Sequence, residues 1–257
     1  MNLVVARQMF AAELLKLRRN RALMGFAFVL SVGVLALFLG YDALQHASNP
    51  AQHGPAGGAA NFGRAVRVLG LFFGALTAIL IGTEAGTADV SSGVFRDLVA
   101  TGRSRLALFA VRAPAATVLT LAFSAAGFAL ALAVSFALAG ESPTPSASLI
   151  LQSAGWIVLS NAILASLAVG IGSINGSRGV TLTAVIGWQT IATQLLLNVT
   201  SLGSARDALL TPALTQVMPV QGGSGVTMAT GIAVAVMAGW LVCPLLVGAW
   251  RTQTRDA

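Results

Sequence analysis

The chain has 257 residues, of which 56% are hydrophobic and only 9% are charged, and its mean hydropathy is +0.83. This composition lies far from that of soluble globular domains and is typical of a polytopic membrane protein. The net charge of +7 does not indicate a nucleic-acid partner, because the basic residues are dispersed in loops and chain ends beside apolar stretches, where they set membrane topology.

The segment at 3–21 predicts an amphipathic helix before the first apolar stretch. Apolar residues recur there at helical spacing, and most charged residues lie elsewhere around the turn. The apolar set is Met9, Phe10, Leu14 and Leu17. We expect this helix to lie in the inner membrane interface, either as a basic anchor alone or as a contact surface for a partner.

Six apolar stretches follow, each close to the length of about 20 residues that a helix needs to cross the bilayer. They lie at 22–41, 66–82, 113–140, 148–174, 180–199 and 226–250. No connection is longer than about 30 residues, too few for a soluble domain. The sequence therefore predicts an all-α polytopic membrane protein with six transmembrane helices, and residues 1–257 form a single transmembrane domain.

The distribution of basic residues predicts the orientation. With a cytoplasmic N-terminus, three of the 15 Lys and Arg residues fall outside, namely Arg64, Arg67 and Arg206, and the other twelve fall inside. The positive-inside rule thus places both termini in the cytoplasm of a cell that holds this chain in its cytoplasmic membrane.

The outer connections offer little chemistry. The first, at 42–65, carries His46 and His53 in a Gly- and Pro-rich stretch without a nearby acidic or cysteine ligand, so we expect no metal site. The last, at 200–225, predicts a short helix at 205–210 that ends before Pro212. The single cysteine, Cys243, lies in the last span and predicts no disulfide.

The chain lacks the residues of an ATPase or of an ion-coupled site. The only lysine, Lys16, is followed by Leu17 and has no phosphate-binding glycine loop before it. The centres of the spans carry no charged residue of the kind that ion coupling requires. The run Gly222–Gly225 contains a serine, as intramembrane proteases do, but a nucleophilic serine needs a nearby base. Both histidines lie in the first outer connection, so this run is interpreted as a turn.

Span five carries an unusual polar set. Its members are Gln189, Thr190, Thr193, Gln194 and Asn198, and Asn161 in span four is a possible addition. Three of them recur every four residues and should share a helical face. These side chains predict either hydrogen bonds between helices or a substrate path.

The connection at 83–112 gathers charge in a chain that otherwise almost excludes it. Its charged residues include Glu84, Asp89, Arg96, Asp97, Arg103 and Arg105. This pattern predicts a cytoplasmic surface that meets another protein in water. The alternative is a solvated loop whose arginines only fix the topology.

The same connection resembles that of permease subunits in the ABC-2 family of ATP-driven exporters. The similar residues are Glu84-x-Gly86-Thr87, the run from Gly93 to Leu98, the run from Thr101 to Arg105, and Arg112 at the entry to span three. The basic N-terminal helix, the six spans and the tail from Trp250 to Asp256 extend the resemblance over most of the chain. The chain departs from the family pattern at Gly102-Arg103, where proline often precedes the Ser-Arg pair.

The resemblance implies that Val90–Leu98 forms a coupling helix seated in a groove of a separate nucleotide-binding subunit. Apolar contact would come from Val94, Phe95 and Leu98, and charge complementarity from Arg96, Asp97, Arg103 and Arg105, with Glu84 and Gly86 in the same motif. This chain would bind no cofactor, because ATP and Mg²⁺ belong to the partner.

The resemblance also implies a second permease, identical or related, with a pathway between the two that spans two and five partly line. An autonomous secondary transporter or channel is the alternative, and a noncatalytic membrane scaffold is the third possibility. Uncharged spans suit an amphipathic, apolar or peptide-like cargo better than a densely charged one.

Overall fold

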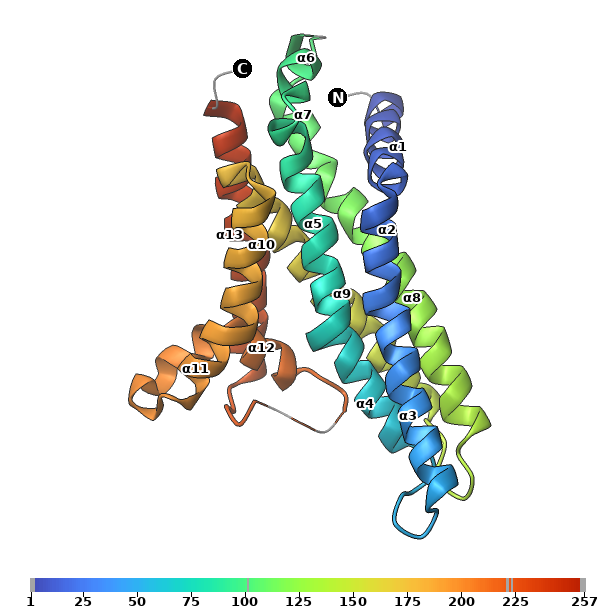
Figure 1. The fold of residues 1–257 in the computed structure, drawn as a ribbon. Helices are drawn as coiled ribbons and strands as arrows, with labels where there is room; N and C mark the ends of the chain where they lie inside the picture. Colours follow the sequence, from blue (N-terminus) through green and yellow to red (C-terminus); the bar gives the residue numbers. More distant parts are fainter. Residues whose placement is uncertain (1–2, 101, 221, 223, 255–257) are drawn as a thin grey trace.

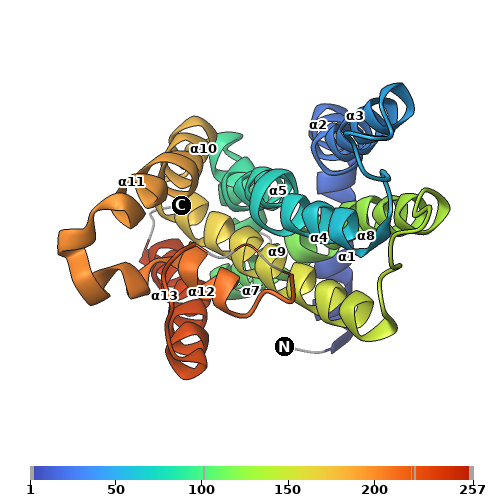
Figure 2. The same ribbon diagram turned by 90° about the horizontal axis from the view of Figure 1, so that it is seen from below.

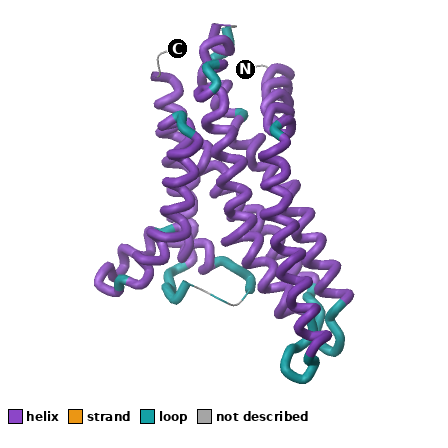
Figure 3. Tube along the Cα trace, in the orientation of Figure 1, coloured by secondary structure: helices purple, strands orange, loops and turns teal. Residues whose placement is uncertain are grey.

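A computed structural model describes residues 3–100, 102–220, 222 and 224–254 as a bundle of long helices (Figure 1). Short loops connect them, and the described residues form no strand (Figure 3). This result confirms the all-helical class predicted from the sequence. Thr101, in the coupling motif, and Arg255, in the predicted cytoplasmic tail, lie outside the described residues.

Six helical segments are long and apolar enough to cross a membrane, which confirms the predicted number of candidate spans. Their bounds are Arg21–Ser48, Gly58–Ser91, Arg105–Ala137, Ala147–Asn175, Arg178–Asn198 and Thr230–Thr254. They agree with the predicted stretches in order and extend beyond most of their ends.

Three of these spans contain a π-helical turn that divides them. Span one comprises α2 (Arg21–Phe28), the turn Val29–Gly33 and α3 (Val34–Ser48); span two comprises α4 (Gly58–Arg67), the turn Val68–Phe72 and α5 (Phe73–Ser91); span five comprises α10 (Arg178–Ile186), the turn Gly187–Ala192 and α11 (Thr193–Asn198). The other spans are α7 (Arg105–Ala110) with α8 (Arg112–Ala137), α9 (Ala147–Asn175) and α13 (Thr230–Thr254). Shorter elements are α1 (Leu3–Arg19), α6 (Val94–Ala100), the 3₁₀ helix η4 (Thr200–Ala208) and α12 (Leu210–Gln216).

The first outer connection is shorter than the predicted 42–65, because helix continues at both of its ends. The polar residues there remain helical through pairing between the two helices: Arg64 on α4 forms an ion pair of 3.1 Å with Asp42 on α3. Prediction from apolar residues alone therefore ended span one too early, at 41 instead of Ser48, and began span two too late, at 66 instead of Gly58.

The predicted helix at 205–210 is wrong in its bounds. Residues Thr200–Ala208 form a 3₁₀ helix instead, and α12 follows at Leu210–Gln216 with Pro212 inside it. Proline is tolerated there because it lies in the first turn, where a backbone N–H has no partner within the helix.

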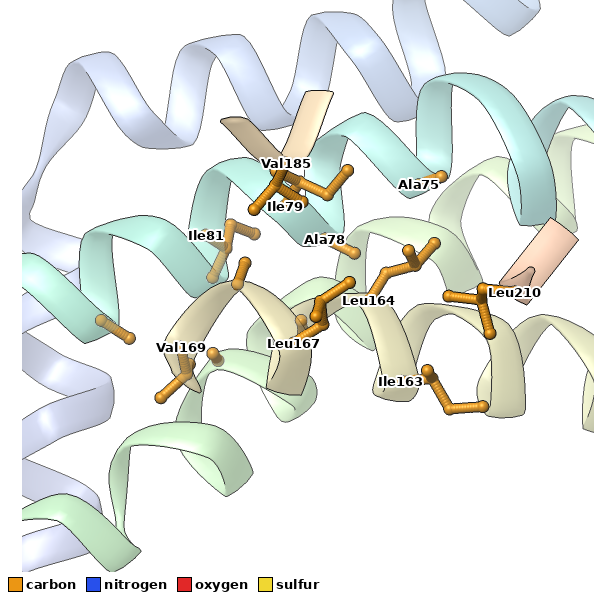
Figure 4. Close-up of a cluster of buried hydrophobic side chains, with 14 of the residues drawn as sticks. Ala75, Ala78, Ile79, Ile81, Ile163, Leu164, Leu167, Val169, Val185 and Leu210 are labelled. Carbon is orange, nitrogen blue, oxygen red and sulfur yellow. The ribbon is translucent and has the colours of Figure 1, made fainter. Parts of the chain in front are cut away.

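Helix α9 lies in the middle of the bundle, between α5, α8 and α13 (Figure 2). The main core forms where it meets α5: Ile79 and Ile81 on α5 pack with Leu164 and Leu167 on α9, and Val185 of α10 joins them (Figure 4). Since each of these side chains is at most 2% exposed, the core fixes how these helices are placed relative to one another.

Small residues let α5 and α9 approach closely. A Cβ atom on Gly82 would lie 2.3 Å from the carbonyl oxygen of Ala165, and one on Gly86 would lie 2.7 Å from that of Val169. Close approach of this kind is a common way for membrane helices to pack.

Both termini and α6 lie at the same end of the bundle (Figure 1). Helix α1 is separated from α2 at Asn20, whose extended backbone (φ −76°, ψ 92°) interrupts the helix while its side chain accepts the N–H of Leu23. Helix α1, which precedes this break in the chain, runs across the end of the bundle and packs against α8 (Figure 2). Its place in the membrane interface, and the cytoplasmic position of this end, stay predictions.

Candidate functional site

The predicted coupling connection forms a compact helical hairpin at the end of the bundle that holds the termini. Helix α5 continues to Ser91, and α6 begins at Val94 after Gly93, which adopts φ +76°. The expected helix at Val90–Leu98 is therefore two separate helices with a tight turn between them. A left-handed turn of this kind favours glycine, because a Cβ atom would be strained there.

A buried ion pair anchors α6 to the bundle. Arg112, at the start of α8, is 1% exposed and donates to Asp89 on α5 at 2.9 Å. The guanidinium carbon of Arg112 lies 5.8 Å from the ring centre of Phe95 on α6, within range of a cation–π contact. Phe95 itself is only 4% exposed. Its expected role as an apolar contact for a partner is thus corrected: it faces inward and positions α6.

The ion pair extends to α1 and α9. Lys16 on α1 bonds the other oxygen of Asp89 at 3.0 Å and Glu13 at 2.6 Å. On the far side, Arg112 lies 3.5 Å from the hydroxyl of Ser173, on α9. We call Glu13, Lys16, Asp89 and Arg112 the inner ion cluster. It joins α1, α5 and α8 at the base of α6.

Burial raises the pKa of the Glu13 carboxyl, because desolvation disfavours its charged form more than the neighbouring Lys16 favours it. One of its oxygens, Oε1, is buried with no hydrogen-bond partner. The cluster therefore contains an acid that is costly to ionise.

Glu84 lies beside the inner ion cluster and forms a second link between helices. It accepts a hydrogen bond from Asn20 at 2.9 Å and pairs with Arg178, at the start of α10, at 3.2 Å. Gly86, two residues further along α5, is packed against α9. Both predicted residues thus act inside the fold, where they hold α5 against its neighbours.

The outward side of the hairpin holds the other predicted residues. Val94 is 43% exposed, and Arg96, Asp97 and Arg103 are exposed as well. Leu98 and Arg105 are half-buried, and Arg105 donates to the backbone carbonyl of Gln253 near the end of α13 at 2.9 Å. We call Val94, Arg96, Asp97 and Arg103 the outer α6 surface. It carries apolar and charged groups of both signs.

A polar cavity of about 390 Å³ lies beside α6. Lys16 and Arg178 border it with Glu84, Asp89 and Val94, and small residues near the end of α5 complete its wall. This hollow adjoins the outer α6 surface and joins it to the inner ion cluster.

The polar residues of span five divide into two sets. Gln189 and Thr193 are buried, and Gln189 donates to the hydroxyl of Thr211 on α12 at 3.1 Å. Thr190, Gln194 and Asn198 are exposed on the single chain, as their spacing predicts for one shared face. The π-helical turn at Gly187–Ala192 lies between the two parts of this span.

Asn161 does not contact the polar residues of span five in the hydrogen bonds of the described structure. It is fully buried on α9 and donates to Ser124 on α8 at 2.8 Å. Its second polar atom, Oδ1, is buried without a partner. The hydrogen-bonding interpretation therefore applies to part of the set, while the exposed face keeps the path interpretation open.

No group of three or more His, Cys, Asp or Glu side chains in the described part of the chain is arranged to hold a metal ion. His46 instead bonds through Nδ1 to the backbone oxygen of His53 at 2.8 Å. The inner ion cluster has carboxylates, but two cations already occupy its centre.

Comparison with known protein families finds no matching family model, and comparison with characterised proteins finds no matching relative. Assignment of a function therefore rests on the residues and their geometry.

The inner ion cluster was not predicted from the sequence. Asp89 was expected on an outward surface, Arg112 at a span entry, and Lys16 in a helix at the membrane interface. The sequence did hold one signal, because the acidic residues Glu13 and Asp89 are both predicted near the same end of the spans. The two cations that pair with Asp89 are distant along the chain, however: Lys16 is 73 residues away and Arg112 is 23 residues away.

Proposed function

We propose that the chain is the permease subunit of an ABC exporter, which moves a substrate across the cytoplasmic membrane with ATP hydrolysed by a separate nucleotide-binding subunit. The observation that carries this proposal is the fixed presentation of α6. Its inner side is held by Phe95 and Arg112, and its outer surface is exposed.

A loop that only set topology would need arginines but no fixed helix. Burying Arg112 and Asp89 removes two charges from water, and such a pair seldom repays its desolvation in stability. Retention of the pair is better explained by a need to hold α6 in one orientation. A docking surface has that need, because a partner binds a preorganised helix with less loss of entropy.

In this proposal the nucleotide-binding subunit holds ATP and Mg²⁺ and receives the outer α6 surface in a groove. Movement of that groove pushes on α6. The contact between Phe95 and Arg112 transfers the displacement to α8, the pairing of Arg112 with Asp89 transfers it to α5, and Lys16 transfers it to α1. Rigid-body rocking of the bundle would then alternate access to the substrate.

A second permease, identical or related, completes the pathway. Thr190, Gln194 and Asn198 are exposed on the single chain, where lipid would leave their free polar groups poorly solvated. Against a second bundle they would line an aqueous path or bond across the interface.

An autonomous secondary transporter or channel is the second candidate. The buried oxygens Asn161 Oδ1 and Gln189 Oε1, which have no hydrogen-bond partner, favour it as polar atoms available inside the spans. Transport without an ATP-binding partner would support the autonomous transporter or channel over the exporter. Absence of any solute movement would instead support a noncatalytic membrane scaffold.

Site-directed crosslinking tests the exporter proposal. Since Cys243 is the only cysteine, its replacement allows a crosslinker to be attached at one chosen position. In a Cys243→Ser background, Arg96→Cys places a photo-crosslinker on the outer α6 surface, and Gln52→Cys places one in an exposed loop at the opposite end (Figure 1). We expect position 96, and not position 52, to crosslink in native membranes to a protein that binds ATP. Absence of such a product from position 96, with normal membrane insertion, would contradict the proposal.

A further inference from the structure

Helix α1 presents two chemically different faces. Its one acidic residue, Glu13, and its one lysine, Lys16, turn toward the bundle, where they join the inner ion cluster. Leu17 is buried on the same side at 1% exposed. The inward face therefore uses the only carboxylate of α1 in an internal contact.

The outward side carries arginines. Arg7, Arg18 and Arg19 are exposed, and Arg21, at the start of α2, is exposed as well. None of the four forms an ion pair within the described residues. At 3.6 residues per turn, Arg18 and Arg19 lie about 20° and 120° from Arg7 around α1, and Lys16 lies about 180° from Arg7. The three arginines of α1 therefore share its exposed side, while the paired Lys16 lies on the inward side.

Three of these arginines lie around the start of the first candidate membrane span. Arg18 and Arg19 precede the break at Asn20, and Arg21 is the first residue of the first candidate span. Residues at the end of a span lie at the level of the lipid headgroups, where arginine side chains extend toward phosphate.

Aliphatic side chains share the outward face. Leu3, Val4 and Leu15 are 86%, 60% and 50% exposed. A lipid surface accommodates both groups at once, because the acyl boundary takes the aliphatic chains while phosphates pair with the guanidinium groups. An acidic protein surface would complement only the charge unless it also offered an apolar patch.

We propose that the outward face of α1, with Arg18, Arg19 and Arg21 at its centre, binds the phosphate headgroups of anionic phospholipids. The contact of Lys16 with Asp89 then ties this lipid-bound helix to α5. The proposal is independent of the exporter assignment, because it concerns only the chain and the bilayer.

Lipid titration of the purified full chain in detergent tests it, with bound lipid counted by native mass spectrometry. The probes are phosphatidylglycerol, which is anionic, and phosphatidylcholine, which is zwitterionic. The variant is R18Q/R19Q/R21Q. The control is R96Q/R103Q/R251Q, which removes the same charge from exposed arginines at the same end.

We expect the wild type to prefer phosphatidylglycerol and the variant to bind it at least tenfold more weakly, with phosphatidylcholine unchanged. The basis is roughly 1 kcal/mol per basic residue at an anionic surface, or about fivefold in affinity for each arginine. The control should keep the preference. If the variant does not fold, raising the salt concentration on the wild type should selectively weaken phosphatidylglycerol binding.

Equal binding of the two lipids by the wild type would overturn the proposal, as would equal losses in variant and control. If the variant keeps its lipid preference but loses a soluble protein that copurifies with the wild type, the face docks a protein and the lipid assignment is wrong. With a misfolded variant, salt-insensitive phosphatidylglycerol binding would be the contradicting result.

Discussion

Replacement of Asp89 by asparagine removes the centre of the inner ion cluster. The substitution keeps the size of the side chain but leaves Arg112 charged and 1% exposed, with no carboxylate at 2.9 Å. Removal of one partner from a buried ion pair costs about 3–5 kcal/mol. Lys16 suffers less, because it retains Glu13 at 2.6 Å and its side chain is 34% exposed.

These magnitudes predict an order of stability among variants. Lys16→Met should lower the free energy of unfolding by about 1 kcal/mol, since its pairing is partly screened by water. Asp89→Asn should lower it by at least twice as much. At about 3 °C for each kcal/mol in a chain of this size, the melting temperature should fall by about 10 °C. The double variant Asp89→Asn with Arg112→Met should recover most of this loss, because no unpaired charge remains buried.

Thermal unfolding in detergent, followed by tryptophan fluorescence, measures five proteins on the same scale: the wild type, Lys16→Met, Asp89→Asn, Arg112→Met and the double variant. Equal effects of Asp89→Asn and Lys16→Met would refute the reasoning, because they would show that the pair with Arg112 is not the buried centre of the cluster. Additive losses in the double variant would refute it as well, since the coupling between the two residues would then be absent.

Three further predictions follow from other parts of the structure. The raised pKa of Glu13 means that folding favours its protonated form, so the stability of the wild type relative to Glu13→Gln should fall as pH rises from 4.5 through the raised pKa. Melting curves of both proteins across this range measure the difference, and a difference that does not change with pH would show that Glu13 is solvated. Gly82→Ala should cost about 1–3 kcal/mol of stability, because its Cβ atom would lie 2.3 Å from a backbone oxygen, whereas Gly155→Ala, where nothing lies within 4 Å, should be tolerated; equal melting temperatures would disprove the close approach of α5 and α9. Replacing Gln194 and Asn198 by leucine should leave the fold of the single chain intact but weaken association of two copies or block solute movement, and crosslinking together with liposome flux would contradict the assignment if both were unchanged.

The sequence was sufficient to predict the helical class and the number of candidate spans, because apolar length is a local property. It was insufficient for the ends of the spans. Asp42 lies in a stretch that composition assigns to a loop, yet it remains helical through its contact with Arg64 on the next helix. Such pairing depends on the approach of two helices, which no local pattern encodes.

The candidate site shows the same division. The exposure of Val94, Arg96 and Asp97 agrees with the outward surface predicted from local charge. The inward roles of Phe95 and Asp89 were not predictable in this way, because they depend on Arg112 and on a helix that begins near the N-terminus.

The most direct test of the account is quantitative mass spectrometry of the proteins that copurify with this chain from its native membrane in mild detergent. The account predicts a stoichiometric ATP-binding subunit, which is lost when Val94, Arg96 and Asp97 are replaced by alanine and kept when exposed residues at the opposite end are replaced. A preparation that preserves other membrane complexes but contains no ATP-binding partner would contradict the central claim and favour an autonomous transporter or channel.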